Sequence, residues 1–475
     1  MPGPHHARAV VAASARARAT ADLLARYDRP GPRYTSYPTA VEFHEGVGPE
    51  RYLEKLEAAS ARPEAPLAAY VHLPFCAERC TFCGCNVIIT KDAALADDYV
   101  AMLDREVGLV AAPLGRRRRL AQLHWGGGTP THLPPDALRR VWDLLMARFE
   151  LAPDAEVAIE VDPRVTTPEQ ARLLVELGFN RVSMGVQDFD PAVQVAINRF
   201  QTPEQTTDLH ARFRDLGVPS INFDLVYGLP RQSPASFATT VERTLALRPE
   251  RVAVYSYAYV PWKEANQNRI LPEDLPPREV KFELFGIAHD LFTAAGYVQI
   301  GMDHFALPSD GLARAAAAGE LYRNFMGYTT HPAEDSVGFG VSAIGDLGGA
   351  FVQNTKKLNR YRDLLDRGVP PVERGFERSP DDELRRDVIQ ALMCNFHLDV
   401  RALERAHGID FEATFRDALD ELDAGPVAHG FVRRTPEAID VTEAGRLFVR
   451  NVCMPFDAYL AKHQAGPKPT FSRTV

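Results

Sequence analysis

The sequence contains no hydrophobic run that approaches the roughly 18 to 20 residues needed to cross a bilayer. Only 6 of its 475 residues are cysteine, and they are not spread along the chain as a disulfide framework requires. Basic residues are too few for a typical nucleic-acid-binding domain, because 54 Lys and Arg against 63 Asp and Glu give a formal charge of -9. These absences predict a cytoplasmic protein without a membrane span or a nucleic-acid partner, in which clustered thiols bind metal or do chemistry.

The remaining composition is that of a globular protein with a large core, since 45% of the residues are hydrophobic and 25% are charged. At about 150 residues per domain, the length allows roughly two to four domains. Residues 7–28 are rich in Ala and Arg, which suits either an organellar transit peptide or an N-terminal helix. We favour the helix, because no cleavage-site pattern is present. A basic cluster at 116–119 is interpreted as a solvent-exposed turn rather than a phosphate- or partner-binding site.

Short apolar segments alternate with longer amphipathic ones from about residue 66 onward. The apolar segments predict buried parallel strands at 67–72, 120–125, 157–161, 181–186, 221–226 and 252–257. Helical patterns lie between them, for example at 136–150 and 168–178. This succession of βα units favours either a doubly wound sheet or a barrel.

The position of the unusual polar and glycine motifs favours the barrel. Each of these motifs falls at the end of a predicted strand or just after it, and the carboxyl ends of barrel strands converge on one rim. A doubly wound sheet would place ligands at a single switch point instead. We therefore predict an α/β fold, a partial (β/α)6 TIM-like barrel that is open on one side. Residues 1–65 are expected to form an N-terminal extension, 66–365 the barrel and 366–475 a mainly helical C-terminal domain.

Cys76, Cys80 and Cys83 are spaced C-x3-C-x2-C in the loop that follows the first predicted strand. Cysteines on such a loop can hold a [4Fe–4S] cluster, and three ligands leave one iron open, as catalytic metal sites require. The alternative is a structural zinc site, which usually draws two C-x2-C pairs from separate segments. No second pair is present. His72 alternates with apolar strand residues and is interpreted as a packed histidine rather than a ligand.

A run of three glycines follows the second predicted strand, in HWGGGTPTHL at 124–133. Glycines allow the backbone to approach a ligand closely, and exposed N–H groups can bind carboxylate or phosphate. Such a turn alone is weak evidence, because any tight turn can use glycine. Its position one βα unit after the cysteine loop makes it specific.

Together these motifs resemble the radical S-adenosylmethionine enzymes, and more closely the family of oxygen-independent coproporphyrinogen III oxidases (dehydrogenases). The resemblance runs almost through the whole chain and is carried by GPRYTSYPTAVEF (31–43), YVHLPFCAERCTFCGCN (70–86), LHWGGGTPTHL (123–133), IEVDPR (159–164), RVSMGVQDF (181–189), INFDLVYGLP (221–230), IGMDHFA (300–306), YRNFMGYTT (322–330) and RNVCMPFDAYL (450–460). Cys85 completes a C-x3-C-x2-C-x-C pattern, which favours the oxidases over the related haem-trafficking proteins. Those proteins remain the alternative, as does a non-catalytic cluster or zinc module.

The resemblance implies anaerobic oxidative decarboxylation of coproporphyrinogen III to protoporphyrinogen IX in haem biosynthesis. Hydrogen must be removed from an unactivated propionate β-carbon, which no side-chain base can achieve, so the reactive group belongs to a cofactor and no catalytic side chain is assigned. The implied cofactors are a [4Fe–4S] cluster on Cys76, Cys80 and Cys83 and two S-adenosylmethionine molecules, one of them bound to the open iron. A flavodoxin or ferredoxin is the expected electron donor, and the protein is expected to be a monomer.

The resemblance also transfers cofactor-binding positions motif by motif. The first S-adenosylmethionine is assigned to Tyr70, Gly127, Glu160 and Ile344. The second is assigned to Phe82, Gly128, Thr129, Gln187, Arg199, Asp224 and Ala258. Carboxylates suit ribose hydroxyls or an amino group, and an arginine can pair with a carboxylate through two hydrogen bonds. The strand-end positions of Glu160 and Asp224 favour these roles over helix caps or surface charges.

A substrate with four carboxylates needs local cations. Arg33 and Arg323 are candidates, with ordinary surface ion pairs as the alternative. The segment before the first strand is expected to close over the open side of the barrel and exclude water from the radical.

Four further residues are interpreted less specifically. Asp303 and His304 are either functional or a hydrogen-bonded core pair. Cys394 and Cys453 lie on predicted helices and are interpreted as buried small apolar residues.

Overall fold

A computed structural model describes residues 22–331, 333–464 and 469–474. Most of the helix predicted at 7–28 lies outside the described residues, and its end at 22–27 is helical. Among the described residues, no helix is both long and apolar enough to cross a membrane.

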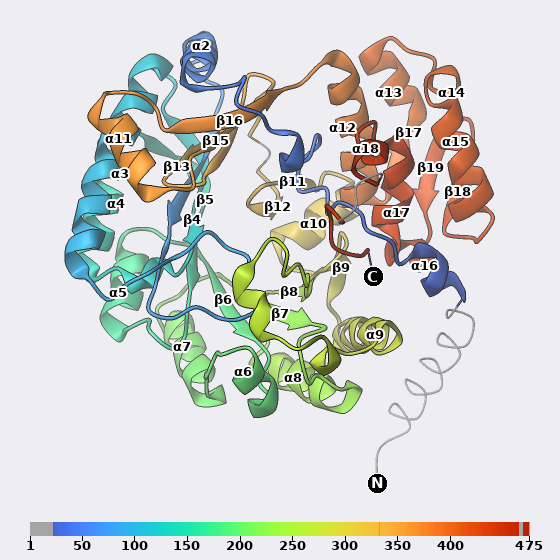
Figure 1. Ribbon diagram of the computed structural model, residues 1–475, viewed down its shortest axis with the longest axis horizontal. Coiled ribbons are helices and arrows are strands. Elements are labelled where there is room, and N and C mark those ends of the chain that lie inside the picture. The colour runs from blue at the N-terminus through green and yellow to red at the C-terminus, as the bar shows by residue number, and fades with distance from the viewer. Residues whose placement is uncertain (1–21, 332, 465–468, 475) are drawn as a thin grey trace.

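Within the described residues, the predicted strands form the parallel centre of a large sheet. In spatial order they are β1 (Leu67–Leu73), β4 (Arg119–Gly127), β5 (Glu150–Val161), β6 (Arg181–Gln187), β7 (Ser220–Tyr227) and β8 (Arg251–Ser256). Figure 1 shows the helices wrapped around this sheet in the left half of the molecule. The predicted α/β fold, a partial (β/α)6 barrel, is confirmed.

The sheet continues beyond this parallel centre on both sides. On the β1 side, β13 (Asp335–Phe339) adds in parallel, followed by antiparallel β14 (Ile344–Leu347), β15 (Ala350–Asn354) and β16 (Val372–Glu377). On the β8 side, β10 (His304–Ala306) and β9 (Val298–Ile300) add in antiparallel orientation. The strand order starts at β16 and ends at β9, so the barrel is open between these two edges.

The helices between the parallel strands begin at strong capping sequences. Their bounds are α3 (Ala93–Leu114), α4 (Pro135–Met146), α5 (Pro168–Glu176), α6 (Pro191–Ala196), α7 (Pro203–Asp215) and α8 (Pro234–Leu247). Thr167, Thr202 and Ser233 each form a capping box, and proline follows each of them. The helix predicted at 136–150 ends earlier, because Glu150 already belongs to β5.

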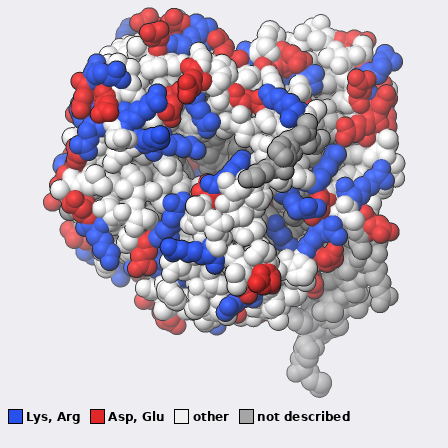
Figure 2. Space-filling model, viewed as in Figure 1, with Lys and Arg blue, Asp and Glu red and all other residues white. Residues whose placement is uncertain are grey.

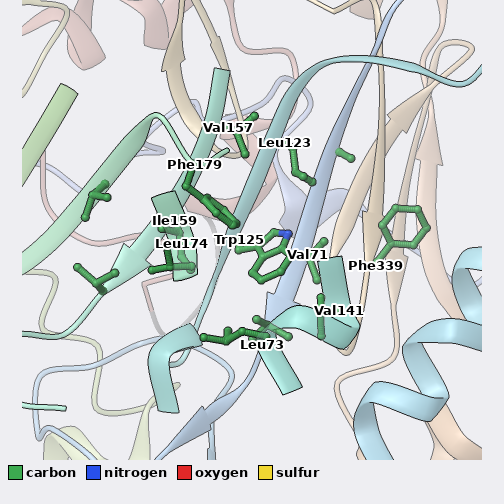
Figure 3. Packing of buried hydrophobic residues seen from close by; sticks show 14 of the residues in the cluster. Val71, Leu73, Leu123, Trp125, Val141, Val157, Ile159, Leu174, Phe179 and Phe339 are labelled. Carbon is green, nitrogen blue, oxygen red and sulfur yellow. The ribbon is translucent and has the colours of Figure 1, made fainter. Parts of the chain in front are cut away.

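The core lies between the sheet and these helices. Figure 3 shows Trp125 of β4 surrounded by side chains from neighbouring strands and from α4 and α5. Trp125 is fully buried and meets Phe179 edge-to-face, with ring centroids 4.9 Å apart. Since strands of this sheet are covered on both faces, their sequences are almost continuously apolar.

Beyond the barrel the chain forms a second cluster of helices, drawn at the right of Figure 1. They are α12 (Pro380–Asn395), α13 (Val400–His407), α14 (Phe411–Thr414), α15 (Arg416–Leu422), α16 (Glu443–Arg446), α17 (Val449–Cys453) and α18 (Leu460–Gln464). A small sheet in the order β17 (His397–Asp399), β19 (Ala438–Val441), β18 (Val432–Arg434) was not predicted. Cys394 and Cys453 are buried here, as expected. The domain boundaries at 65 and 365 remain a prediction.

The remaining α-helices and β-strands of the described chain lie between or before these elements. They are α2 (Pro49–Ala59), α9 (Arg278–Ala294), α10 (Gly311–Ala318), α11 (Leu358–Asp366), β2 (Phe75–Cys76), β3 (Ile88–Ile89), β11 (Tyr322–Asn324) and β12 (Gly327–Thr329).

The basic cluster at 116–119 is not simply a solvent-exposed turn, and that interpretation is wrong for Arg117. Its side chain is fully buried and pairs with the buried Asp335 at 2.6 Å. It also donates to the backbone oxygens of Ala59, Ala65 and Pro66. Only the folded chain brings Asp335, which lies more than two hundred residues away in sequence, next to this turn.

Candidate active site

A cavity of about 580 Å³ opens at the carboxyl ends of the parallel strands. It is lined by the cysteine loop, the glycine turn after β4 and the ends of β5 to β8. All predicted cluster and cofactor residues except Tyr70 and Ile344 line it: Cys76, Cys80, Phe82, Cys83, Gly127, Gly128, Thr129, Glu160, Gln187, Arg199, Asp224 and Ala258. Of the two candidate cations for the substrate, Arg33 lines the cavity, whereas Arg323 does not and donates to the backbone oxygen of Arg33 at 3.1 Å. The fold therefore gathers the loops after β1 and β4 and the ends of β5 to β8 around one space, as the barrel hypothesis requires.

The cysteine loop is held from outside by amide side chains of a short 3-10 helix, η3 (Ala265–Arg269). Asn266 donates to the backbone oxygens of Cys80, Thr81 and Cys83 at 3.2, 3.0 and 2.9 Å. Gln267 donates to the backbone oxygen of Phe82 at 3.0 Å. Sequence reasoning missed both amides, because nothing in the local sequence marks them. Their bonds hold the loop in place through its backbone oxygens.

The thiols of the loop lie in different environments. Burial raises the pKa of Cys76 to about 11, whereas a hydrogen bond from the Cys85 thiol is the main cause that lowers the pKa of Cys83 to about 7. The backbone N–H of Cys85 also donates to the sulfur of Cys83 at 3.4 Å. Cys83 is therefore the thiol of this pair that ionises more readily, and Cys85 acts as its hydrogen-bond donor.

The donor set fits an iron–sulfur cluster. Three thiols on one loop face the cavity, and such cysteines are the usual ligands of a [4Fe–4S] cluster. In the part of the chain that the structure describes, no three His, Cys, Asp or Glu side chains converge as one metal ion would require. The origin of the three thiols in one loop favours a cluster over the structural zinc alternative, which usually draws two C-x2-C pairs from separate segments.

The glycine turn is required by close packing. A Cβ on Gly128 would lie 2.6 Å from the backbone oxygen of Pro74, and one on Gly126 would lie 2.8 Å from a carboxylate oxygen of Glu160. Gly127 has a φ of +121°, which disfavours other residues. The expectation that exposed N–H groups bind a ligand is wrong for Gly127, Gly128 and Thr129: their N–H groups donate to Glu160, to Leu73 O and to Phe75 O.

Two carboxylates, at the ends of β5 and β7 on either side of β6, face the cavity with different electrostatics. Glu160 accepts hydrogen bonds from Gly127 N–H at 3.2 Å and from His124 at 3.4 Å. Burial opposes ionisation of Glu160, but these bonds outweigh burial and lower its pKa. Burial raises the pKa of Asp224 to about 6, although Ser183 donates to it at 2.9 Å. Glu160 is the ionised partner for a cationic ligand group, and Asp224 is easily protonated.

Arg199 is held in place by the cavity wall. It donates to Asp162 at 3.0 Å, to the backbone oxygen of Gly185 at 2.7 Å and to Gln201 at 3.0 Å, while its Nε has no partner among the described residues. Burial opposes ionisation of Asp162, but Arg199 and Arg164 outweigh it and lower its pKa. Gln187 lies opposite with a φ of +66°, a strained conformation of the kind that accumulates at functional sites.

Tyr70 and Ile344 lie beyond the lining of the cavity but close to one another. In the sheet Tyr70 is opposite Gly338, and a Cβ on Gly338 would be 2.7 Å from the backbone oxygen of Ile344. Tyr70 stacks on His124, with ring centroids 5.9 Å apart, and His124 contacts Glu160. Tyr70 is thus connected to the cavity through His124 and Glu160.

His72 and His304, for which two interpretations were open, are both packed inside the protein. His72 bonds to Asn86 O at 2.9 Å and to the Tyr70 hydroxyl at 3.1 Å, as expected for a strand histidine. Asp303 and His304 are buried and bonded at 2.7 Å, and neither is among the residues that line the large cavity. This arrangement favours the core-pair interpretation.

A partial parallel barrel with a C-x3-C-x2-C loop at its rim defines a radical S-adenosylmethionine enzyme. Residues 70–244 match the model of the Radical SAM superfamily, and residues 379–448 match that of the HemN C-terminal domain. This superfamily implies a [4Fe–4S] cluster and S-adenosylmethionine.

Known proteins similar to the whole chain narrow the family. An oxygen-independent coproporphyrinogen III oxidase of Pseudomonas aeruginosa is 48% identical over 96% of this chain and 98% of its own length. An oxygen-independent coproporphyrinogen III oxidase of Salmonella typhimurium is 45% identical over 95% of this chain and 98% of its own length. The solved coproporphyrinogen III oxidase (HemN) of Escherichia coli is 44% identical, with a TM-score of 0.86 over 90% of this chain and 97% of that chain. The chain belongs to the oxygen-independent coproporphyrinogen III oxidase family.

Proposed function

We propose that this protein converts coproporphyrinogen III to protoporphyrinogen IX without oxygen, in haem biosynthesis in the cytoplasm. The single observation that carries the proposal is the cavity in which three cysteines, a glycine turn and two carboxylates face one space. The names of the full-length relatives support the substrate. Each of two propionate side chains loses a hydrogen atom, one further electron and CO2, and becomes a vinyl group.

The cofactor-binding roles are part of the proposal. Cys76, Cys80 and Cys83 hold a [4Fe–4S] cluster, and one iron remains open to S-adenosylmethionine. When bound, these groups supply the 5′-deoxyadenosyl radical that removes hydrogen from the propionate β-carbon. The protein itself binds and orients the cofactors and the substrate, and it excludes water from the site.

Two S-adenosylmethionine molecules bind in each active site in this proposal. The first lies against Tyr70, Gly127, Glu160 and Ile344. The second lies against Phe82, Gly128, Thr129, Gln187, Arg199, Asp224 and Ala258. The ionised Glu160 suits the cationic amino group of the ligand, and this pairing is supported by the hydrogen bonds that lower its pKa.

The remaining roles concern partners and solvent. A flavodoxin or ferredoxin delivers the electron, and the protein acts as a monomer. The segment before β1 excludes water from the radical; this is supported by Arg33, which belongs to that segment and lines the cavity. Deleting residues 1–40 tests the lid, and intact activity with unchanged cofactor cleavage would refute it.

An anaerobic assay with coproporphyrinogen III, S-adenosylmethionine and a one-electron reductant tests the function. Formation of vinyl product together with 5′-deoxyadenosine is expected. A protein that cleaves S-adenosylmethionine and binds haem but forms no vinyl product would instead be a trafficking protein of the same branch. Absence of both cleavage and product would overturn the enzymatic proposal.

A further inference from the structure

Several arginines line the cavity, and most of them form ion pairs with carboxylates of the protein. Of the arginines that line it, Arg164 and Arg199 pair with Asp162 at 2.7 and 3.0 Å, and Arg79 pairs with Glu264 at 3.5 Å. Arg33 differs: its guanidinium donates to the backbone oxygen of Ser256. Within the described ranges, no carboxylate forms an ion pair with it. Arg33 is therefore the cavity arginine that has no carboxylate ion pair, although the buried Asp303 lines a smaller pocket together with it.

This positive charge in the cavity matters because the chain as a whole carries a net negative charge. The chain is acidic overall, with a formal charge of -9. On the face drawn in Figure 2, basic side chains are interspersed with acidic ones. A ligand that carries several carboxylates must accordingly be recognised by individual cations in the cavity rather than by a broad basic surface.

Arg33 belongs to a segment that Arg450 of α17 holds from behind. The Arg450 side chain is 6% exposed and makes its hydrogen bonds with backbone oxygens. It donates to Gly31 and Pro32 on one side, immediately before Arg33. On the other side it donates to Arg473 at 3.1 Å and to Thr474 at 3.3 Å. Arg450 thus joins the segment that carries Arg33 to the C-terminal tail, residues 469–474.

The tail and the N-terminal segment also bind one another directly. Gly31 N–H donates to Ser472 O at 3.1 Å, and Thr474 N–H donates to Arg29 O at 2.9 Å. A Cβ on Gly31 would lie 2.9 Å from Thr474, so the two strands of chain are tightly packed. In Figure 1 the C terminus lies beside the N-terminal segment, between the barrel and the helical cluster.

The burial of the Arg450 guanidinium is expected to destabilise the free protein. A buried guanidinium without a carboxylate partner carries a large desolvation penalty. Burial and, after it, the neighbouring Arg33 lower the pKa of Arg450 to about 9. Arg33 and Arg450 line the same smaller pocket, so two cations lie close together there, and a bound anion would relieve their repulsion.

We propose that Arg33 binds a carboxylate of the tetrapyrrole substrate, and that Arg450 and the C-terminal tail position it for this role. Arg33 is the binding residue, and Arg450 is a positioning residue. A guanidinium can hold a carboxylate with two parallel hydrogen bonds, which would orient one propionate side chain relative to the cluster. The proposal rests on the proposed substrate class, a porphyrinogen with free carboxylates.

Binding of coproporphyrin III, the stable fluorescent oxidised form of the substrate, tests Arg33. Its tetramethyl ester, which has the same ring without the negative charges, is the matched probe. In R33Q the acid is expected to bind about 10- to 100-fold more weakly, as for the loss of charged hydrogen bonds, while binding of the ester is unchanged. R33K is expected to be intermediate. R29Q is the control, because Arg29 is on the same segment but pairs with the exposed Glu421.

Removal of residues 469–475 tests the positioning role, and R450M tests it independently. Each is expected to weaken binding of the acid as R33Q does, raising KM for coproporphyrinogen III, with unchanged iron content and S-adenosylmethionine cleavage in the absence of substrate. Combined with R33Q, the deletion is expected to add little, because both act on one interaction. An additive loss, or loss of ester binding as well, would make the tail merely structural and overturn its role. Should R450M not fold, the tail deletion alone decides.

The results separate two kinds of failure. If the wild-type protein forms vinyl product and binds coproporphyrin III but R33Q binds it equally well, the role of Arg33 is wrong and the proposed function stands. If the wild-type protein neither binds the acid nor converts the substrate, the proposed function itself is wrong.

Discussion

Asn266 donates a hydrogen bond to the backbone oxygen of Cys83 at 2.9 Å, although the two residues lie 183 positions apart. The same amide reaches the backbone oxygens of Cys80 and Thr81. One side chain of η3 therefore determines the shape of the loop whose thiols form the proposed cluster site. Through Asn266, the segment that follows β8 in the chain holds the cysteine loop after β1 in position.

We expect Asn266→Ala to weaken cluster retention rather than folding. Each lost hydrogen bond removes about 1 kcal/mol, so the loop should sample open conformations more often. Iron should be lost to a chelator about 10-fold faster than from the wild type, with little change in the thermal midpoint. Asn359→Ala, on α11, is the control, since within the described residues the Asn359 side chain bonds only to the adjacent Arg360 N–H. Equal rates of iron loss in both variants would contradict the role of Asn266.

The glycine turn predicts a contrast in stability. In Gly128→Ala the new methyl group would meet backbone atoms of Pro74 and Phe75 at 2.6 to 2.8 Å, which cannot move without displacing the cysteine loop. A loss of about 1 to 3 kcal/mol in the free energy of unfolding is expected from such overpacking. Gly286→Ala on α9 has open space around the new Cβ and should stabilise by about 0.5 to 1 kcal/mol. Urea unfolding measures both, and equal effects would refute the packing explanation.

Glu106 predicts a pH dependence of stability. It is buried on α3 and accepts hydrogen bonds from Gly340 N–H, Asn354 and Tyr361. Burial raises its pKa to about 7 from an ordinary value of 4.5, despite these bonds. Between these two values the unfolded chain loses the proton while the native protein keeps it, so the stability contributed by the neutral form declines as pH rises.

The corresponding variant is Glu106→Gln, which cannot ionise. Across the same pH window the wild type should lose about 3 kcal/mol more stability than this variant, at about 1.4 kcal/mol per pH unit. The free energy of unfolding from pH 4.5 to 7 measures the difference. Parallel curves for the two proteins would mean that Glu106 is ionised in the fold.

The sequence predicts the parallel strands well, because they depend on a local pattern, whereas the cofactor-binding positions at the cavity are transferred from the family resemblance. Strands that are buried on both faces must be continuously apolar, and site residues at strand ends follow those runs directly. The strands β9, β10, β14 and β17 to β19 have only three or four residues each, which is too short for a periodic pattern, so they could not be predicted. The same limit applies to Asn266, to the buried Arg117–Asp335 pair and to Arg450, whose partners come together only in the folded chain.

The central claim is a cluster held by three thiolates with one iron open, and its most direct measurement is spectroscopy on anaerobically reconstituted protein and cysteine variants. We expect about four irons and four sulfides per chain in the wild type. The EPR spectrum of the reduced cluster should shift when S-adenosylmethionine is added. Cys85→Ser should retain the cluster, while serine at Cys76, Cys80 or Cys83 should abolish it. Loss of the cluster in Cys85→Ser alone, or a spectrum that S-adenosylmethionine leaves unchanged, would contradict the account.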